Sequence, residues 1–445
     1  MARRRLPPEM TLQTETLRAD GLGVAAYDSR RVHMRNALPG EAVTARVLRR
    51  RKGVFYADAQ PLEGEPLHPS RVPPACEVYP RCGGCVLQHV SGYAQLELKQ
   101  QALTDALEAH GVAVGLWRPP ERAEPFGYRT KARLGVRQVG EQVLVGFRES
   151  FSNRVAKVSA CPILAPRLSA LIAPLKVLLS DLSIAAQVPQ VEVALGDGED
   201  EVALLLRHLA EPSARDIKRL QAFARNHRVQ LLLQSKGYDT LTCILGDPVR
   251  QLSYRLAPWG LLMRYHPAQF TQVNLAMNQR LIRQVLGYLG DLRDRQVVDL
   301  FCGIGNFSLP LARRGAVVTG IEGAEDAVAK ARENASLNGL AERCEFAAQD
   351  LYSDDPQLPV RVDALVVDPP RSGLGPRADR WAARWRECGA AQVVYVSCNP
   401  TTFASDAVVL QAAGYRLASV GVFDMFPHTG HVETVGHFVN EPGDG

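Results

Sequence analysis

The segment at residues 297–307, VVDLFCGIGNF, limits the possible folds more than any other part of the sequence. An apolar run rich in β-branched residues leads directly into Gly303 and Gly305, and a helical pattern follows. Glycines in such a turn let the backbone come close to a ligand that a Cβ would exclude. The segment therefore predicts a strand, a ligand-binding turn and a helix, which together begin a Rossmann-like α/β domain.

Two further expected strands end beside acidic residues. The strand expected at 317–322 ends in Glu322, and the strand expected at 344–348 is followed by Asp350. A carboxylate at the first of these positions suits the two hydroxyls of a ribose. The second carboxylate is placed to meet the amino group of an adenine. Together they predict a nucleoside-binding pocket at one edge of the sheet.

The residues around the glycine turn favour a methyl donor over a nicotinamide cofactor. Nicotinamide enzymes prefer a third glycine soon after the second, whereas Phe307 and Ser308 follow Gly305 here. Class I methyltransferases have the same order of features: a glycine turn, then a strand ending in Glu, then a strand ending in Asp. We therefore expect S-adenosyl-L-methionine as the cofactor, with Phe301 and Asn306 among its contacts.

A fifth strand is expected to end at a cysteine. The apolar run at 393–397 stops abruptly at Cys398, which Asn399 and Pro400 follow. A cysteine at a strand end is usually a small buried hydrophobic residue, but a neighbouring methyl-donor turn favours a nucleophile. The rival thiol, Cys302, lies in the cofactor turn. The remaining cysteines of this half are interpreted as core residues: Cys243, Cys344 and Cys388.

The strand expected at 362–368 ends in the sequence Asp-Pro-Pro-Arg, which begins with Asp368. Amino-directed methyltransferases carry an aromatic residue after the two prolines, where it stacks on the target base. Arg371 occupies that position here. The pattern therefore favours a methyl acceptor other than an exocyclic amine.

Three motifs together resemble the RNA uracil-C5 methyltransferase family. They are Asp-Pro-Pro-Arg at 368–371, Ser-Cys-Asn-Pro at 397–400 and His-x-x-His-Val-Glu-Thr-Val at 428–435. The resemblance extends over residues 266–438. It implies a class I methyltransferase domain at 266–445 that methylates carbon 5 of a uracil.

The resemblance also implies a role for individual side chains. The thiolate of Cys398 would add to carbon 6 of the uracil, and Glu433 would remove the proton from carbon 5. Asp368 would hold the base edge and the cofactor side. Gln272 and Phe270 match positions that bind the cofactor or stack on a flipped uracil.

Four cysteines of the first half have the spacing of a metal site. Cys76, Cys82 and Cys85 form a Cys-x5-Cys-x2-Cys motif, and Cys161 follows with a proline after it. Four thiolates suit either a [4Fe–4S] cluster or a structural zinc ion. The similarity to the ribosomal RNA members of the family favours the iron–sulfur cluster. Radical S-adenosyl-L-methionine enzymes need Cys-x3-Cys-x2-Cys, so a redox role is not indicated.

The first 65 residues predict a small RNA-binding barrel. Short strands are expected at 11–18, 41–48 and 53–60, and glycine or proline turns separate them. Residues 1–60 hold 12 Lys and Arg against 6 Asp and Glu, an excess of 6, while the whole chain has +5. This imbalance favours a polyanionic partner. The region resembles the TRAM domain, an oligonucleotide-binding (OB)-type barrel.

A middle domain of the α+β class is expected at 66–265, and its helix near 92–111 is expected to pack on the catalytic domain. Strands are expected at 128–136, 143–147, 191–195, 202–207, 229–234 and 241–245, and helices at 165–180 and 211–226. Basic and aromatic residues gather near the last cysteine of the motif, a combination suited to unstacked RNA. They are Arg129, Lys131, Arg133, Phe147, Arg148, Arg154 and Lys157.

The combination of barrel, four-cysteine motif and methyltransferase domain resembles the branch of the family that acts on 23S ribosomal RNA. Other possibilities are a transfer RNA or another ribosomal RNA uridine, and an RNA cytosine-C5 methyltransferase. A non-catalytic RNA-binding or ribosome assembly protein is the alternative from a different class. No apolar run approaches the ~18 residues of a membrane span. We expect a monomer in the cytoplasm.

Overall fold

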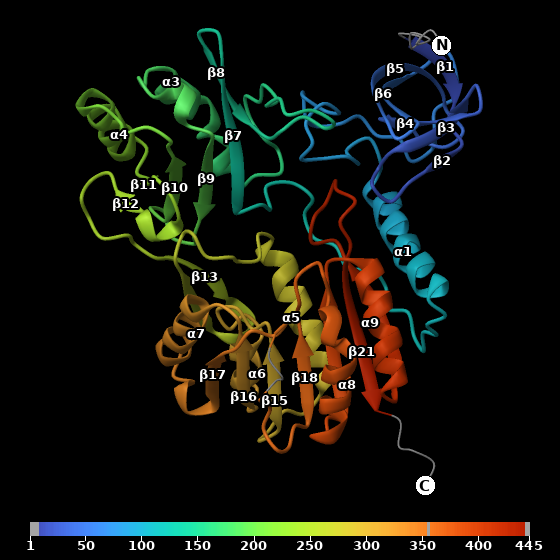
Figure 1. The fold of residues 1–445 in the computed structure, drawn as a ribbon, viewed down its shortest axis with the longest axis vertical. Helices are drawn as coiled ribbons and strands as arrows, with labels where there is room; N and C mark the ends of the chain where they lie inside the picture. The colour runs from blue at the N-terminus through green and yellow to red at the C-terminus, as the bar shows by residue number, and fades with distance from the viewer. Residues whose placement is uncertain (1–8, 354–356, 441–445) are drawn as a thin grey trace.

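The computed structural model describes residues 9–353 and 357–440, and three large sheets organise it (Figure 1). The first has the strand order β1-β5-β6-β4-β3-β2. Alternate side chains of β1 are buried, as expected of a half-buried strand. They pack around Met34 and Phe55 in a core of its own. The strands are β1 (Glu9–Gln13), β2 (Thr16–Leu17), β3 (Gly23–Tyr27), β4 (Arg30–Arg35), β5 (Ala42–Arg51) and β6 (Val54–Pro61).

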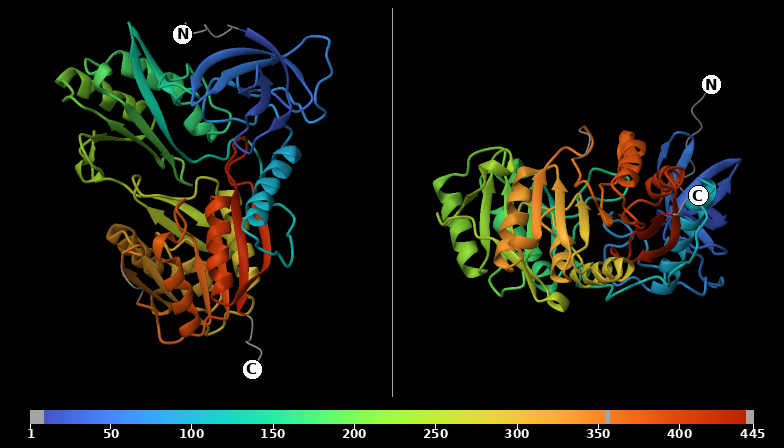
Figure 2. Two further views of the ribbon diagram at one scale, coloured as in Figure 1. Left: turned by 45° about the vertical axis from the view of Figure 1, so that its right-hand side comes forward. Right: turned by 90° about the horizontal axis from the view of Figure 1, so that it is seen from below.

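Helix α1 (Gly92–Ala109) follows the segment that carries the first three cysteines. The Ser91 side chain accepts a hydrogen bond from the Ala94 N–H and caps the helix start. Leu103 and Leu107 are buried in the same apolar core as Phe403 of the C-terminal domain. Figures 1 and 2 show α1 beside the C-terminal strands and helices rather than beside the middle sheet. Sequence-distant segments therefore share one core.

The middle sheet has the order β12-β11-β10-β9-β7-β8 and carries its helices on one flank. Its buried side chains form a second core that includes Leu134, Val193 and Leu204. The strands are β7 (Lys131–Val139), β8 (Gln142–Gly146), β9 (Gln190–Leu195), β10 (Val202–Arg207), β11 (Gln230–Gln234) and β12 (Thr242–Cys243). The helices are α2 (Pro166–Ser169), α3 (Ile172–Ser180) and α4 (Ala214–Asn226), with 3₁₀ turns η1 (Ala185–Gln187) and η2 (Tyr238–Thr240).

A hairpin of β13 (Leu252–Leu256) and β14 (Leu261–Tyr265) connects the middle sheet to the C-terminal domain. The 3₁₀ turn η3 (Ala257–Trp259) lies between them. The hairpin was not predicted. Side-chain oxygens of Asn338 and Asn334 accept backbone hydrogen bonds from Leu262 and Arg264, each at 2.9 Å. Long-range contacts of this kind leave no local sequence signal.

The C-terminal sheet has seven strands in the order β17-β16-β15-β18-β19-β21-β20. β15 to β19 run parallel, and β21 pairs antiparallel with both β19 and β20. The strands are β15 (Gln296–Leu300), β16 (Val317–Glu322), β17 (Cys344–Ala348), β18 (Ala364–Val367), β19 (Gln392–Ser397), β20 (Tyr415–Phe423) and β21 (Glu433–Asn440). The α/β fold with a class I methyltransferase sheet is thus present as predicted.

Helices flank this sheet and lie between its parallel strands in the chain (Figure 1). Such crossovers bury parallel strands on both sides, and every residue of β18 is buried. The helices are α5 (Leu275–Leu289), α6 (Ser308–Arg313), α7 (Glu325–Leu337), α8 (Ala378–Glu387) and α9 (Pro400–Ala412), with η4 (Ala341–Arg343) and η5 (Gly375–Arg377). Within the described ranges, no helix has the length and apolar character that a membrane crossing requires.

Several expected elements are shorter or divided. The strand expected at 11–18 is interrupted between β1 and β2, and that at 241–245 contributes only two residues, β12. The helix expected at 165–180 breaks into α2 and α3. Pro174 has no N–H for a continuous helix, but it is tolerated in the first turn of α3.

Candidate active site

Cys398, Glu433 and Asp368 meet where three neighbouring strands end or begin. Asp368 directly follows β18, Cys398 directly follows β19, and Glu433 is the first residue of β21. Ser397 pairs with Thr434 in the antiparallel ladder of β19 and β21. The next positions beyond this pair are Cys398 and Glu433, so the register brings them together.

The electrostatic surroundings of Cys398 favour the neutral thiol in the absence of ligands. Burial, then the charges of Glu433 and Asp368, raise the pKa of Cys398 to about 11, and the nearby Arg371 guanidinium acts in the opposite direction. Burial, followed by the charge of Asp368, raises the pKa of Glu433 well above its usual range. Burial raises the pKa of Asp368 to about 7. A cationic ligand beside these carboxyl groups would favour their ionised forms.

The glycine turn after β15 and the carboxylate at the end of β16 are joined by hydrogen bonds. Glu322 accepts hydrogen bonds from the backbone N–H groups of Gly303 and Ala324, both at 3.1 Å. Phe301 begins the turn at φ +60°, which is strained for a residue with a bulky side chain. A Cβ at Gly305 would collide with Leu309, and its φ of +92° also favours glycine. The turn is therefore fixed by residues on both sides.

The other predicted cofactor residues have different surroundings. Asp350 is exposed, and its carboxylate accepts hydrogen bonds from the Tyr352 N–H at 2.9 Å and the Ser353 hydroxyl at 2.5 Å. Its side chain therefore closes a local turn in this structure. The Asn306 side chain exchanges two hydrogen bonds with Asn278, at 2.8 and 2.9 Å. That exchange fixes the turn to α5.

Phe270 and Gln272 lie on the segment that leads into α5. Phe270 is 78% exposed, which is unusual for a large aromatic side chain, and Gln272 is half-buried. Asn274 caps α5 by accepting from the Met277 N–H, and its amide donates to the Met425 carbonyl at 3.1 Å. Lys131 donates to the carbonyls of Pro267 and Gln269 at 2.8 and 2.5 Å. The segment is thus held from two sides while the Phe270 ring stays free.

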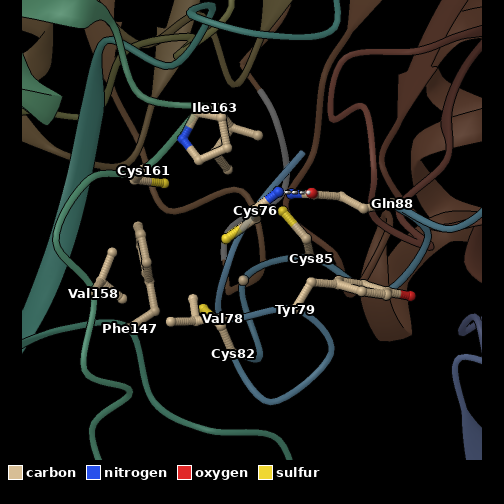
Figure 3. A pocket seen from close by; sticks show the side chains of 12 residues that line it. Cys76, Val78, Tyr79, Cys82, Cys85, Gln88, Phe147, Val158, Cys161 and Ile163 are labelled. Atoms are coloured by element: carbon tan, nitrogen blue, oxygen red, sulfur yellow. Dashed lines mark hydrogen bonds between the residues drawn. The ribbon is translucent and has the colours of Figure 1, made fainter. Parts of the chain in front are cut away.

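The four predicted metal ligands line a single cavity (Figure 3). Cys76, Cys82 and Cys85 come from the loop before α1, and Cys161 comes from the segment between β8 and α2. Figure 3 shows their sulfur atoms directed toward the same space. The remaining lining is mostly apolar: Val78, Tyr79, Phe147, Val158, Pro162 and Ile163. Within residues 9–353 and 357–440, no cluster of His, Cys, Asp or Glu has the arrangement of a metal site as it stands.

The surroundings of these sulfurs nevertheless suit thiolates. Hydrogen bonds from Gly84 to Cys82 and from the Gln88 side chain to Cys85 favour the charged forms. Burial has the larger effect, and it raises the pKa of these two thiols to about 11 and about 12. Buried thiols with donors at the sulfur are typical of sites where a metal replaces the proton. The donor set therefore fits a four-thiolate group.

A basic groove opens beside the cysteine cavity, and the two share Val78 as a lining residue. Five cationic side chains and a single acidic one, Glu149, line it. The five are Arg81, Arg137, Arg148, Arg154 and Lys157. Of the basic residues singled out in the sequence, Arg148, Arg154 and Lys157 therefore share one surface. Arg133 does not line this groove and pairs with Glu192.

Comparison with known proteins shows the family of this chain. A family described as tRNA (Uracil-5-)-methyltransferase matches residues 92–347 and 358–441. The chain belongs to this uracil-5-methyltransferase family. The matched residues include Cys398, Glu433 and the glycine turn.

Relatives in the family are similar to this chain over almost their whole length. A 23S rRNA (uracil(1939)-C(5))-methyltransferase RlmD from Hahella chejuensis is 41% identical over 98% of both chains. A protein of the same description from Nitrosospira multiformis is 42% identical over 95% of this chain and 97% of its own. These matches include the N-terminal sheet and the four-cysteine segment.

A solved structure is similar to almost the whole of this chain. The crystal structure of Pyrococcus abyssi tRNA (uracil-54, C5)-methyltransferase in complex with S-adenosyl-L-homocysteine has a TM-score of 0.72 and 25% sequence identity. The similarity covers 97% of this chain and all of the other. A uracil-5-methyltransferase can therefore bind the demethylated cofactor on this scaffold.

Two residues near the uracil-5-methyltransferase site were missed as candidates in the sequence. Asp299 is fully buried in β15 and accepts a hydrogen bond from the Ser308 hydroxyl at 2.5 Å. Its other carboxylate oxygen has no hydrogen-bond partner among residues 9–353 and 357–440. The sequence feature that could have revealed Asp299 is an acidic residue inside an otherwise apolar strand. Arg371 was noted only for replacing an aromatic residue, yet its charge lowers the pKa of Cys398. A proximity of this kind appears only after folding.

Proposed function

We propose that this protein transfers a methyl group from S-adenosyl-L-methionine to carbon 5 of a specific uridine in 23S ribosomal RNA. The observation that carries the proposal is the meeting of Cys398 with Glu433 and Asp368 beside the glycine turn of a methyltransferase sheet. The names of the relatives that match nearly the whole chain support the choice of RNA. The family supports the choice of base and carbon atom.

The chemistry requires a thiolate because carbon 5 of uracil is a poor nucleophile. The Cys398 sulfur forms a bond to carbon 6, and the ring becomes an enolate whose carbon 5 takes the methyl group. The bond between that methyl group and the donor sulfur breaks, and S-adenosylhomocysteine leaves. Glu433 then accepts the proton from carbon 5. The double bond between carbons 5 and 6 forms again as the Cys398 thiolate is expelled.

The carboxyl groups around the site are suited to a cationic donor. Asp299, Asp368 and Glu433 have raised pKa values, with burial as the first cause in each case. A sulfonium bound beside them would favour their ionised forms and thereby prepare Glu433 to act as a base. The Glu322 carboxylate would accept hydrogen bonds from the ribose hydroxyls of the cofactor. Further cofactor contacts are assigned to Gln272, Phe301, Asn306, Asp350 and Asp368.

The target uracil would leave its stack and enter the site from the side of Phe270. The exposed ring of Phe270 offers a surface on which a flipped base can stack. Gln272 and Asp368 would contact the polar edge of the base. Arg371 would stabilise the thiolate of Cys398 before it adds to the ring.

We assign a [4Fe–4S] cluster to Cys76, Cys82, Cys85 and Cys161, with structural zinc as the alternative. The shared cavity and the hydrogen-bond donors at the sulfurs support this assignment. When bound, either group would join the loop before α1 to the segment before α2. Iron and sulfide analysis of protein purified without oxygen distinguishes the two, because zinc alone would exclude the cluster.

RNA would also contact the N-terminal half. The six-stranded sheet of residues 9–61 is proposed as a TRAM-type, oligonucleotide-binding domain on the basis of its turns and charge. Arg49 lies over the rings of Tyr56 and Phe151, at 4.9 and 4.8 Å, and so joins this domain to the loop after β8. The basic groove beside that loop has the charge to follow a phosphate backbone.

The test uses purified protein with methyl-labelled S-adenosyl-L-methionine and unmodified 23S ribosomal RNA or transfer RNA, followed by nucleoside analysis. We expect label in 5-methyluridine from ribosomal RNA. Label found only in transfer RNA would show that transfer RNA, and not ribosomal RNA, is the substrate. Label in 5-methylcytidine would show that cytosine, and not uracil, is the target base. Labelling of neither RNA would favour the non-catalytic RNA-binding or assembly alternative.

A further inference from the structure

The loop between β20 and β21 connects directly to Glu433. Residues 424–432 form this loop, and Glu433 is 4% exposed immediately after it. Side chains and backbone groups from remote parts of the chain hold the loop. Its position therefore depends on elements that lie outside the methyltransferase domain.

Gln95 of α1 holds the centre of the 424–432 loop. It is 2% exposed, and its carbonyl oxygen accepts a hydrogen bond from the His428 N–H at 2.8 Å. Its amide nitrogen donates to the carbonyls of Leu87 and Val90, at 3.1 and 2.8 Å. One buried side chain therefore connects the loop with the segment that follows Cys85.

Lys99 holds the beginning of the loop one turn further along α1. It is 1% exposed, and its ammonium group donates to Asp424 at 2.6 Å and to the Phe426 carbonyl at 3.0 Å. Asp424 is itself 5% exposed. A buried ion pair with a further hydrogen bond restricts both partners to one arrangement because neither charge can be left unpaired.

The segment that carries the cysteines makes its own backbone contacts with the loop. The N–H groups of Val86 and Leu87, the two residues after Cys85, donate to the His428 carbonyl at 2.8 and 3.0 Å. His428 has φ +66°, which turns this carbonyl toward them. Its ring stacks on Phe126 with centroids 4.6 Å apart. The loop and the cysteine segment are thus directly hydrogen-bonded.

We propose that Gln95, Lys99 and the backbone of Val86 and Leu87 form a clasp that positions Glu433 for proton removal. In this arrangement, α1 and the cysteine segment serve the catalytic site as positioning elements that act through the 424–432 loop. The proposal rests on the proposed function for the role of Glu433. The four-cysteine site belongs to the same proposal, because Val86 and Leu87 directly follow Cys85.

The main experiment compares Gln95→Met with Gln101→Met. Gln101 lies on the same helix but is exposed, and its side-chain amide donates to Asp105 at 2.7 Å. Hydrogen exchange of the 424–433 peptides and the lifetime of the covalent RNA adduct are measured together with affinity for S-adenosyl-L-methionine. For Gln95→Met we expect faster exchange and an adduct resolved up to about 100-fold more slowly, because a displacement of about 1 Å in a catalytic group has an effect of this size. Cofactor affinity stays unchanged, and Gln101→Met matches the wild type in all three.

A double variant, Lys99→Met with Asp424→Asn, tests the clasp without leaving a buried charge unpaired. It should reproduce the slow adduct resolution and the faster exchange. Cys85→Ser should also raise exchange in the 424–433 peptides, a readout that is independent of enzyme activity. Unchanged hydrogen exchange of these peptides in Cys85→Ser would show that the cysteine segment does not contribute to the clasp.

The proposal is overturned if exchange rises in the Gln95 variant while adduct lifetime and turnover stay at wild-type values. It is also overturned if both the Gln95 variant and the double variant fail to unfold cooperatively, since the contacts would then serve folding alone. Failure of the proposed function is a separate result. In that case the wild type itself forms no adduct and no 5-methyluridine.

Discussion

Cys398 lies beside Glu433 because Ser397 and Thr434 are paired at the ends of the antiparallel strands β19 and β21. The two residues are 35 positions apart in the sequence (433 − 398). A slip of one residue in the ladder would direct the side chains of β21 to the opposite face. The register of this strand pair therefore determines whether nucleophile and base share one site.

Replacing Cys398 by Ala should abolish methyl transfer while leaving cofactor binding intact. The substitution removes the one protein atom that bonds to the uracil ring in the proposed reaction, and it adds no bulk to the pocket. Single-turnover assays with labelled cofactor and calorimetric binding of S-adenosylhomocysteine measure the two effects. Cys243→Ala, at a half-buried cysteine of β12, is the control. Methylation by Cys398→Ala at the wild-type rate would exclude the covalent mechanism.

Replacing Glu433 by Gln should stop the reaction after methyl transfer. The amide cannot accept the proton from carbon 5, so the methylated RNA stays bound to Cys398. Loss of a general base lowers the rate by roughly 10²- to 10⁴-fold. Denaturing gels of enzyme with labelled RNA should show a band of protein joined to RNA, which the wild type resolves. Rapid release of methylated RNA by the variant would show that a residue other than Glu433 is the general base.

Replacing Phe270 by Ala should weaken RNA binding through loss of a stacking surface. Its ring is 78% exposed and so contributes little to the core. Stacking of a base on an aromatic ring contributes about 1–3 kcal/mol, which corresponds to roughly 5- to 150-fold in affinity. Thermal stability should stay unchanged. Tyr93→Ala removes another exposed ring, 69% exposed on α1, and serves as the control in filter-binding assays.

Replacing Asp299 by Asn should flatten the dependence of stability on pH. Burial raises the pKa of Asp299 to about 7, above its ordinary value of 3.8. The folded state therefore holds this proton more tightly, and its contribution to stability is complete below pH 3.8 and is lost as pH rises through about 7. Thermal unfolding without cofactor between pH 4 and 8 measures the slope. An unchanged slope in the variant would mean that Asp299 is ionised throughout.

Neutralising the basic groove should weaken RNA binding in a salt-dependent way. Arg154→Gln with Lys157→Gln removes two of its five cationic side chains. The dependence of log affinity on log salt should become shallower by roughly 0.7 for each single-strand phosphate that the variant no longer neutralises. Arg215→Gln with Lys218→Gln, two exposed positions on α4, controls for net charge. Equal slopes in the two double variants would exclude the groove from the RNA path.

The sequence alone determined the methyltransferase half in considerable detail. The glycine turn, Glu322 and Cys398 are each tied to a strand end, and strand ends can be located from local hydrophobicity. The three large sheets also correspond to regions with distinct local patterns. Family motifs in the sequence indicated Glu433, and the cysteine spacing indicated the four residues that line one cavity.

The tertiary structure decided how these parts act on one another. The burial of Asp299, the approach of Arg371 to Cys398 and the hairpin of β13 and β14 depend on partners remote in sequence. The same is true of Gln95 and Lys99, which the sequence shows only as polar residues of a helix. Hydrophobic periodicity reports which face of an element is buried, but it does not report which remote backbone group a buried polar side chain will meet.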